Sequence, residues 1–302
     1  MQNGEIERLV MSKFGRTFTG HLLNLAPLEL RVKLVMLRSL GYWPNIDNPR
    51  TFNEKIAYRK LRQHDDRYKV LADKWKVRDY VENKIGNRYL SKVYAVIRSI
   101  SELDFESLPE RFVAKPAHKS GEVYFVPSKA EVNRKQIIHI LSGWLNNKYE
   151  DGIKHGEYWY REMLPRVLFE EWLFDGKFKI PLDFKFFVFH GKVHAIQVDF
   201  DRFTNHAINF YTREWRQIPI RKGNRPNKPV NPQDIKPPKL EEMIEVAENL
   251  GNDFDFVRVD FYYLFSTDRI VFGEMTFAPG SGYSPFIPNS YDLKFGRLWR
   301  LS

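Results

Sequence analysis

Apolar and polar residues follow one another with two different spacings along this chain. Early in the sequence the spacing is helical: Leu28, Val32 and Met36 share one face of a predicted helix, and further helices are expected over 53–62 and 68–85. Beyond Arg111 strict alternation dominates, interrupted by helical spacing over 131–149 and 239–250. Strands are predicted over 89–97, 112–116, 122–126, 166–173, 182–190, 192–202, 207–211, 214–218, 254–265 and 269–276. This order predicts an α+β protein with antiparallel sheets.

The two later helices each have a defined apolar face. The first is predicted to bury Ile137, Ile138, Leu141, Trp144 and Leu145. The second is predicted to bury Leu240, Met243, Ile244, Ala247 and Leu250. We expect both faces to lie in the hydrophobic core.

The amino-acid composition indicates the cellular compartment and excludes some classes of protein. The chain has 302 residues and no cysteine, which excludes disulfides and thiolate zinc sites and favours a reducing compartment. The N-terminus lacks the apolar core of a secretory signal, and the leucine-rich stretch 21–40 is broken by charged residues. We therefore expect a soluble, cytoplasmic protein without a transmembrane segment.

The net charge of +10 indicates an acidic partner. The basic residues are dispersed, and the chain has no recognisable nucleic-acid-binding module, so an acidic metabolite or polymer is expected instead of nucleic acid. The loop 219–238 contains Arg221, Lys222, Arg225 and Lys228, which we hypothesise to contact an acidic acceptor. The alternative is a solvated loop without a binding role.

The strongest chemical signal is a predicted hairpin, FVRVDFYYLF and RIVFGEMTF, joined by residues 266–268. A three-residue loop centred on Thr267 places Asp260 opposite Glu274 and Arg258 opposite Thr276. Two opposed carboxylates destabilise a sheet unless they are neutralised, and a divalent cation such as Mg²⁺ does so. Removing one charge is then expected to keep or raise the stability of the metal-free protein. The alternative is that both acids face solvent or pair with lysines.

Three further groups favour phosphate or nucleotide binding. Lys115 precedes the small loop AHKSG, whose backbone N–H groups can cover phosphates, although the pattern is not a Walker A loop. Lys185 lies on an aromatic strand face and either binds an anion or extends its ammonium to water. Glu170 and Glu171 come where a strand ends, and one of them is placed to orient a ribose.

Taken together, these segments resemble the ATP-grasp superfamily, and most of the chain is similar to its TupA-like branch. The similarity rests on TFNEKIAYRKL, DDRYKVLADKWKVRDYV, FVAKPAHKSG, DFKFFVFHGKV, VRVDFY, FGEMTFAPGSG and DLKFGRLWRL. It implies an ATP-grasp fold, in which two α+β lobes with antiparallel sheets grip ATP after a mostly helical N-terminal region. We expect that region over 1–100, the first lobe over 101–173, and the second lobe with the metal site over 174–302.

The resemblance also implies roles for individual residues. Mg²⁺ is assigned to Asp260 and Glu274, and also to Thr276, which stands where related ligases have Asn. Catalysis is assigned to Arg258 and Lys185. ATP binding is assigned to Lys115, His118, Ser120, Gly121, Glu170, Glu171 and Lys185, and substrate binding to Gly280, Ser281 and Gly282.

The activity implied by the resemblance is ATP-dependent formation of an amide through an acyl phosphate. In the TupA-like branch, associated with surface-polysaccharide biosynthesis, the expected substrates are a uronic acid, free or within a polysaccharide precursor, and an amino acid or amine. Two other functions remain open. Asp199-Phe200-Asp201 is a D-x-D sequence, which would suit a metal-dependent glycosyltransferase using a nucleotide-sugar. The many aromatic residues would suit a sugar-binding module without enzymatic activity.

Overall fold

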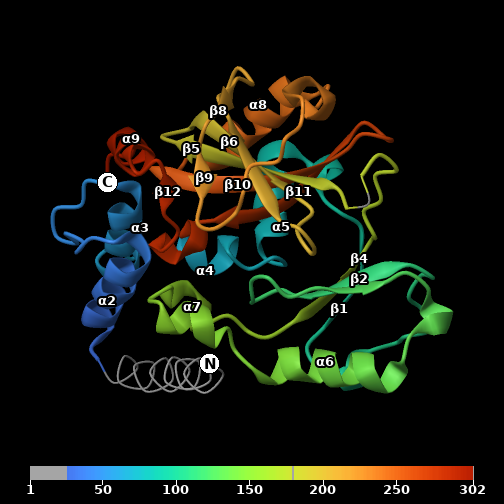
Figure 1. Ribbon diagram of the computed structural model, residues 1–302. Coiled ribbons are helices and arrows are strands. Elements are labelled where there is room, and N and C mark those ends of the chain that lie inside the picture. The colour runs from blue at the N-terminus through green and yellow to red at the C-terminus, as the bar shows by residue number, and fades with distance from the viewer. Residues whose placement is uncertain (1–25, 179, 302) are drawn as a thin grey trace, which may run out of the picture.

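The computed structural model describes residues 26–178 and 180–301, so the first 25 residues of the predicted N-terminal region lie outside the description. Two antiparallel sheets face each other, and each has a helix on its outer side (Figure 1). The helices are α2 (Leu28–Leu40), α3 (Phe52–Leu61), α4 (Arg67–Leu71), α5 (Val77–Ile85), α6 (Arg134–Asn146), α7 (Glu150–Lys154), α8 (Leu240–Gly251) and α9 (Ser290–Leu298). The strands are β1 (Val93–Ile97), β2 (Phe112–Pro116), β3 (Tyr124–Val126), β4 (Val167–Glu170), β5 (Leu182–Phe189), β6 (Lys192–Phe200), β7 (Ala207–Tyr211), β8 (Gln217–Ile218), β9 (Arg221–Lys222), β10 (Phe256–Leu264), β11 (Arg269–Thr276) and β12 (Phe286–Ile287). The predicted α+β class with antiparallel sheets is confirmed.

The smaller sheet has the strand order β1-β4-β2-β3. Helix α6 lies on its face turned away from the larger sheet and contributes Ile137, Leu141 and Trp144 to their shared core (Figure 1). Ile138, predicted to be buried with them, is 40% exposed, because it lies on the outer side of the helix. The opposite face of this sheet is therefore left free to meet the larger sheet.

The larger sheet has the order β11-β10-β5-β6-β7-β8. Its central strand β5 is buried along its whole length because both faces are covered. Helix α8 packs on one face through the apolar residues that its spacing predicted. On the other face Phe52 of α3 and Phe295 of α9 contact Phe187 of β5. They cover only half of this face, and the other half carries the polar residues described below.

The helical part of the chain departs from the prediction at one point. Residues 68–85 were expected to form one helix, but α4 and α5 are separate. Asp73 is fully buried between them, and its Oδ1 accepts the backbone N–H groups of Trp75 and Lys76. Its Oδ2 accepts a hydrogen bond from Arg166, just before β4. These hydrogen bonds hold a turn between α4 and α5, which interrupts the helix, and tie that turn to the smaller sheet.

The β10–β11 hairpin has the predicted pairing at its functional end. Arg258 lies opposite Thr276, and Asp260 lies opposite Glu274. Nearer the turn the pairing shifts by one residue, because the connection starts at Phe265 and a bulge occurs at Gly273. A Cβ atom at Gly273 would lie 3.1 Å from the backbone oxygen of Asp260, so glycine suits the close approach at this bulge.

The division into three domains stays a prediction. Strand β1 falls within 1–100 and pairs with β4 of the smaller sheet. Strands β9 and β12 form a short separate pair beside the larger sheet, and β9 lies in the segment 219–238 that was predicted to be a loop. None of the helices in the described part of the chain has the length and apolar character needed to cross a membrane.

Candidate active site

One face of the larger sheet carries polar side chains in register across four strands. Asp260 lies between Glu274 of β11 and Lys185 of β5. On the far side of β5, Gln197 of β6 lies opposite Lys185. Directly opposed residues of antiparallel strands project from the same face, so these side chains form one continuous polar row. Arg258 belongs to the neighbouring row toward α3, and Asp183 and Asp199 belong to the neighbouring row on the other side.

Asp260 is neutralised by cations of the chain itself. Arg258 donates to it from Nε (2.7 Å to Oδ1) and from Nη2 (2.6 Å to Oδ2), and Lys185 donates from Nζ (2.9 Å to Oδ2). The carboxylate is 2% exposed. The alternative in which the acids pair with lysines is therefore realised at Asp260, and a metal is not needed to relieve its repulsion with Glu274.

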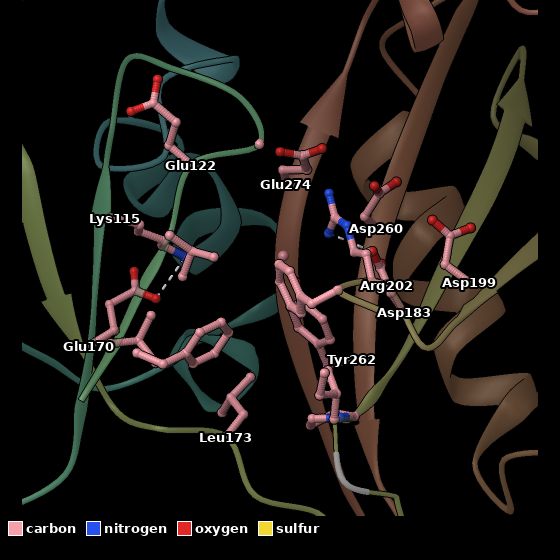
Figure 2. Close-up of a pocket in the computed structure, with 18 of the residues that line it drawn as sticks. Lys115, Glu122, Glu170, Leu173, Asp183, Asp199, Arg202, Asp260, Tyr262 and Glu274 are labelled. Atoms are coloured by element: carbon pink, nitrogen blue, oxygen red, sulfur yellow. Dashed lines mark hydrogen bonds and ion pairs between the residues drawn. The ribbon is translucent and has the colours of Figure 1, made fainter. Parts of the chain in front are cut away.

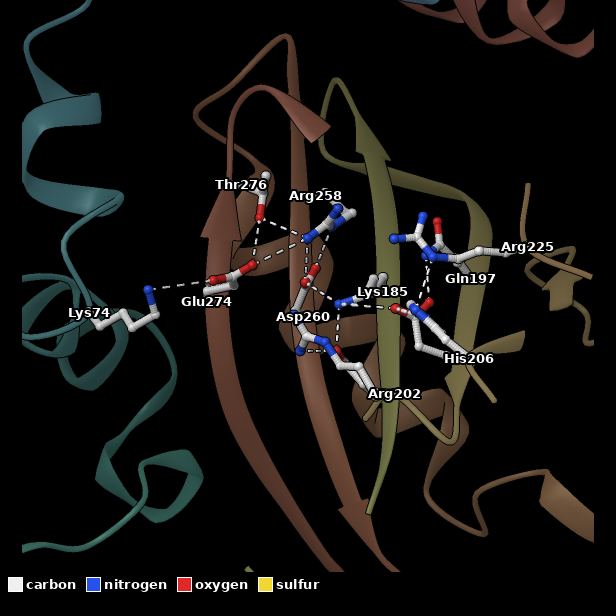
Figure 3. Close-up of polar contacts among 12 residues, drawn as sticks. Lys74, Lys185, Gln197, Arg202, His206, Arg225, Arg258, Asp260, Glu274 and Thr276 are labelled. Atoms are coloured by element: carbon white, nitrogen blue, oxygen red, sulfur yellow. Dashed lines mark hydrogen bonds and ion pairs between the residues drawn. The ribbon is translucent and has the colours of Figure 1, made fainter. Parts of the chain in front are cut away.

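Glu274 is held by a second set of contacts, shown in Figure 3. Its Oε1 accepts from Arg258 Nη2 (3.3 Å) and from the Thr276 hydroxyl (3.2 Å), and its Oε2 lies 4.0 Å from Lys74 Nζ. Burial alone would raise the pKa of Glu274, but Lys74, Arg258 and Lys185 outweigh it and lower the pKa to about 2. The carboxylate is therefore ionised across the physiological range.

Lys185 is the shared cationic neighbour of three buried carboxylates. Its Nζ lies 2.5 Å from Asp183, 2.9 Å from Asp260 and 3.9 Å from Asp199. Burial would lower the pKa of Lys185, but these acids raise it well above the usual lysine range. Arg202 adds a second cation at 3.0 Å from Asp183. With Lys185 charged at any physiological pH, it acts as a fixed cation at the centre of the row.

The opposite wall of the site comes from the smaller sheet (Figure 2). Lys115 of β2 lies 2.7 Å from Glu170 of β4, and both line a cleft together with Gly121 and Glu122. Across it lie Glu274, Asp260, Asp183 and Asp199. The cleft is open to solvent, and charged side chains lie on both of its walls. The smaller sheet thus contributes a lysine–carboxylate pair to one wall of the cleft, and the larger sheet contributes acidic side chains to the other.

Several residues that the sequence singled out lie elsewhere or have another partner. His118 is buried, where Nε2 donates to the Asn147 carbonyl (3.0 Å) and Nδ1 accepts from the Arg166 N–H (3.4 Å). Glu171 lines the cleft but accepts two hydrogen bonds from Arg269. Ser120 is exposed and is not among the cleft residues.

The loop 279–282, predicted to bind substrate, also lies outside the described lining of the cleft. Gly280, Ser281 and Gly282 all have positive φ angles, which produces a tight turn after β11. Lys60 of α3 donates to the Ser281 carbonyl (2.7 Å), and the Ser281 hydroxyl donates to Glu157 (2.6 Å). These contacts fix the turn against the helical part of the chain.

Other residues of the site were not assigned from the sequence. Asp183, Asp199, Arg202, Tyr262 and Lys74 all line the cleft. Asp183 shares a strand face with Lys185, and Asp199 is part of the D-x-D sequence, so both had a local signal. Lys74 and Arg202 had none. They lie in the break before α5 and in the turn after β6, and only the tertiary structure brings them to the cleft.

Two acidic side chains of the cleft suit a metal ion that a ligand helps to hold. Within residues 26–178 and 180–301, no group of three or more histidine or acidic side chains is arranged as a metal cage. Asp260 and Glu274 are opposed and both line the cleft; the Asp260 oxygens already accept from Arg258 and Lys185, while Oε2 of Glu274 lies 4.0 Å from Lys74. Mg²⁺ is usually held by one or two carboxylates together with substrate phosphates, so the donor set fits. The Thr276 hydroxyl accepts from Arg258 (3.0 Å) and donates to Glu274, which positions that carboxylate.

Comparison with known protein families places the chain among ATP-grasp proteins. The family model described as TupA-like ATP-grasp matches residues 54–300. No curated protein matches the chain.

Solved structures with similar folds include three ligases. The D-alanine–D-alanine ligase of Bacillus anthracis, complexed with ATP, is 13% identical with a TM-score of 0.43, covering 76% of this chain and 62% of that one. The L-amino acid ligase of Bacillus licheniformis is 15% identical with a TM-score of 0.39, covering 74% and 46%. The ATP-grasp ligase PsnB, complexed with a precursor variant, Mg and ADP, is 11% identical with a TM-score of 0.39, covering 98% and 73%. The chain thus spans less than two thirds of the first two proteins.

Proposed function

Because the chain belongs to the TupA-like ATP-grasp family, we propose that it is an ATP- and Mg²⁺-dependent ligase that joins a carboxylate to an amine. The observation that carries the proposal is the pair of opposed carboxylates, Asp260 and Glu274, beside Arg258 and across a cleft from Lys115. A nucleotide triphosphate needs cations on its phosphates and oxygen ligands for its metal, and both are present on the walls of this cleft.

The residues of the cleft divide into two sets by charge. Lys115, Lys74 and Arg202 line it and are placed to neutralise phosphate oxygens. Asp260 and Glu274 would hold Mg²⁺, which when bound neutralises charge that develops during phosphoryl transfer. Lys185 and Arg258 hold Asp260 in a fixed orientation with three hydrogen bonds. The metal site is therefore preorganised by cations of the chain.

The proposed reaction has two steps. A carboxylate oxygen of the acid substrate attacks the γ-phosphorus of ATP, the bond to the bridging oxygen breaks, and ADP leaves. The amine nitrogen then attacks the acyl carbon, the C–O bond to phosphate breaks, and phosphate departs with the amine proton. Negative charge spreads over the transferred group in the first step. Arg258 carries a charged guanidinium at the metal-site carboxylates, where it stabilises that charge.

For the substrates, we propose a uronic acid, free or in a polysaccharide precursor, and an amino acid or amine, in surface-polysaccharide biosynthesis. The net charge of +10 supports an acidic substrate. The glycosyltransferase alternative is disfavoured by the match to the ATP-grasp family over residues 54–300. Its two acids, Asp199 and Asp201, both line the cleft, where Asp199 contacts His206 (3.3 Å) and Asp201 pairs with Lys228 (2.6 Å).

One experiment tests the function. We expect ADP release from ATP and Mg²⁺ to depend on a carboxylate and an amine together, measured with uronic acids crossed against amino acids. ATP with Mg²⁺ should also raise the melting temperature, since a ligand that binds the native state stabilises it. UDP-sugars serve as the control. A larger stabilisation by a UDP-sugar than by ATP, without ADP release in any mixture, would contradict the ligase.

A second prediction concerns the nucleotide. Lys115→Met should weaken ATP binding by about tenfold or more, because a charged hydrogen bond to phosphate is lost. The side chain of Lys115 is 20% exposed, so the fold should tolerate the change. Isothermal titration calorimetry measures the affinity. Lys135→Met on α6, an exposed lysine on the opposite face of the same sheet, is the control and should bind ATP normally. Equal affinities in both variants would show that ATP does not contact Lys115.

A further inference from the structure

Lys222 is a buried lysine in a segment that was predicted to be a solvated loop. It is the second residue of β9, pairs with Phe286 of β12, and is 5% exposed. Its Nζ lies 5.4 Å from the ring centroids of both Phe187 and Phe286. The basic residues near it in the sequence, Arg221 and Arg225, are exposed. Lys222 is therefore the buried member of this basic segment.

The ammonium of Lys222 has no anionic partner within the described residues. No carboxylate lies within 4.0 Å of it there, although Asp199 acts on it from a greater distance, and its Nζ lies over the faces of two aromatic rings. Lys185, the other buried lysine on this face, lies near three carboxylates. Burying an ammonium without a counter-ion is costly, and cation–π contacts offset only part of that cost. An anion supplied from outside the chain would stabilise the charged form of Lys222.

The register places Lys222 beside Arg258. Phe187, over which Lys222 lies, is directly opposite Arg258 across the β5–β10 pair, so both project from the same sheet face. Neither Arg258 nor Lys222 is among the residues that line the nucleotide cleft. Asp260, one row nearer the cleft, is opposite Lys185. Arg258 donates to Asp260, which lines the cleft, so an anion between Lys222 and Arg258 would lie beside the metal-site carboxylates and next to the cleft.

We propose that Lys222, acting with Arg258, binds the carboxylate of the acid substrate and presents it for phosphorylation. This inference rests on the proposed ligase function and adds the position of the acid substrate. The exposed Arg225 lies beside the residue that precedes β7, where its Nε donates to Nδ1 of His206 (2.9 Å), as Figure 3 shows. It extends the positive charge from Lys222 toward solvent, which favours the approach of an anion.

The charge state of Lys222 supplies a signature for the test. Burial, the largest effect, and then Arg258 lower the pKa of Lys222 to about 7; Lys185 and Arg225 also lower it, while Asp199 opposes them. A carboxylate binds only the protonated lysine. Binding of the acid should therefore weaken as the pH rises through about 7. Lys222→Arg should keep binding above that pH, because arginine stays charged.

The test measures binding of D-glucuronate and D-galacturonate to the full chain, with the neutral sugar D-glucose as a matched probe, and ADP release with each. We expect Lys222→Met to raise the dissociation constant and the KM for the uronate by about tenfold or more. Lys222→Arg should retain most of the affinity. Lys177→Met is the control, since Lys177 also lies over two phenylalanine rings, Phe178 and Phe265, but is exposed and paired with the Asp234 carbonyl.

The outcomes separate this inference from the proposed function. If wild type releases ADP with a uronate and Lys222→Met has the same KM, the inference is overturned while the ligase stands. If the uronate binds through Lys222 but no amine supports ADP release, the ligase fails while the anion site stands. A wild type that binds neither uronate overturns the assignment to this substrate class. If Lys222→Arg loses kcat at an unchanged KM, Lys222 transfers a proton and does not hold the carboxylate.

Discussion

Glu274→Gln is expected to lower kcat for ADP release by about a hundredfold or more, because it removes one of two charges that would hold the metal. With a pKa of about 2, Glu274 is fully ionised at neutral pH, so the substitution deletes a whole charge. The amide keeps an oxygen that can accept from Arg258 and Thr276, and the side chain is 29% exposed, so the fold should persist. In this variant, Mg²⁺ should no longer increase the shift in melting temperature that ATP produces, as measured in a thermal-shift titration.

The matched control is Glu122→Gln. Glu122 also lines the cleft, but its side chain is 42% exposed and pairs only loosely with Lys119 at 3.6 Å. This variant should keep activity and the Mg²⁺ response within about twofold, as expected for an exposed ion pair. Full activity and a normal Mg²⁺ response in Glu274→Gln would remove the metal from this hairpin, and the proposed ligase would lose the observation that carries it.

Lys185→Met is expected to reduce the free energy of unfolding by about 3–5 kcal/mol at neutral pH, because it leaves buried carboxylates without their shared cation. Asp183, Asp199 and Asp260 are each at most 6% exposed. Urea denaturation measures the difference. Burial already raises the pKa of Asp183 above its usual value, and loss of Lys185 raises it further. A carboxyl group whose pKa is higher in the folded than in the unfolded state favours folding as the pH falls, so the deficit should shrink toward pH 5.

Lys192→Met on β6 is the control for this effect. Lys192 belongs to the same β5–β6 pair, and it contacts Glu248 at 3.2 Å with a side chain that is 72% exposed. An exposed pair of this kind contributes about 0–1 kcal/mol. If Lys185→Met also reduced the free energy of unfolding by less than about 1 kcal/mol, the buried acids would be protonated or solvated, and Lys185 would not be their counter-ion.

The pairing of Asp260 with Glu274 was predicted correctly, although the turn that was assumed for the hairpin is wrong. The sequence placed Asp260 opposite Glu274 by assuming a three-residue turn and regular pairing. The turn is in fact one residue longer on the β10 side, and the bulge at Gly273 returns the pairing to the predicted register. Turn lengths and bulges depend on the backbone conformation of a few residues, which alternation along the strand does not report.

The contacts of Asp260 change the expected effect of its removal on the stability of the metal-free protein. The sequence predicted that Asp260→Asn would keep or raise the stability of the metal-free protein. With Arg258 and Lys185 both donating to Asp260, the structure predicts a loss, because the substitution leaves buried cations partly unpaired. Arg258 lies two residues from Asp260 in the sequence, whereas Lys185 reaches it only through the pairing of β5 with β10.

The sequence by itself determined the features that depend on neighbouring residues. The capping box of Thr51 and Glu54 starts α3, the spacing of α8 defines its buried face, and alternation in the last hairpin places Arg258 and Asp260 on one side. Only the tertiary structure decided which charges meet. Placing β5 between β10 and β6 brings Lys185 to Asp260 and Asp199, and pairing β9 with β12 buries Lys222. Alternation fixes the side of a strand from which a residue projects, but strand order and burial are set by packing across the whole chain.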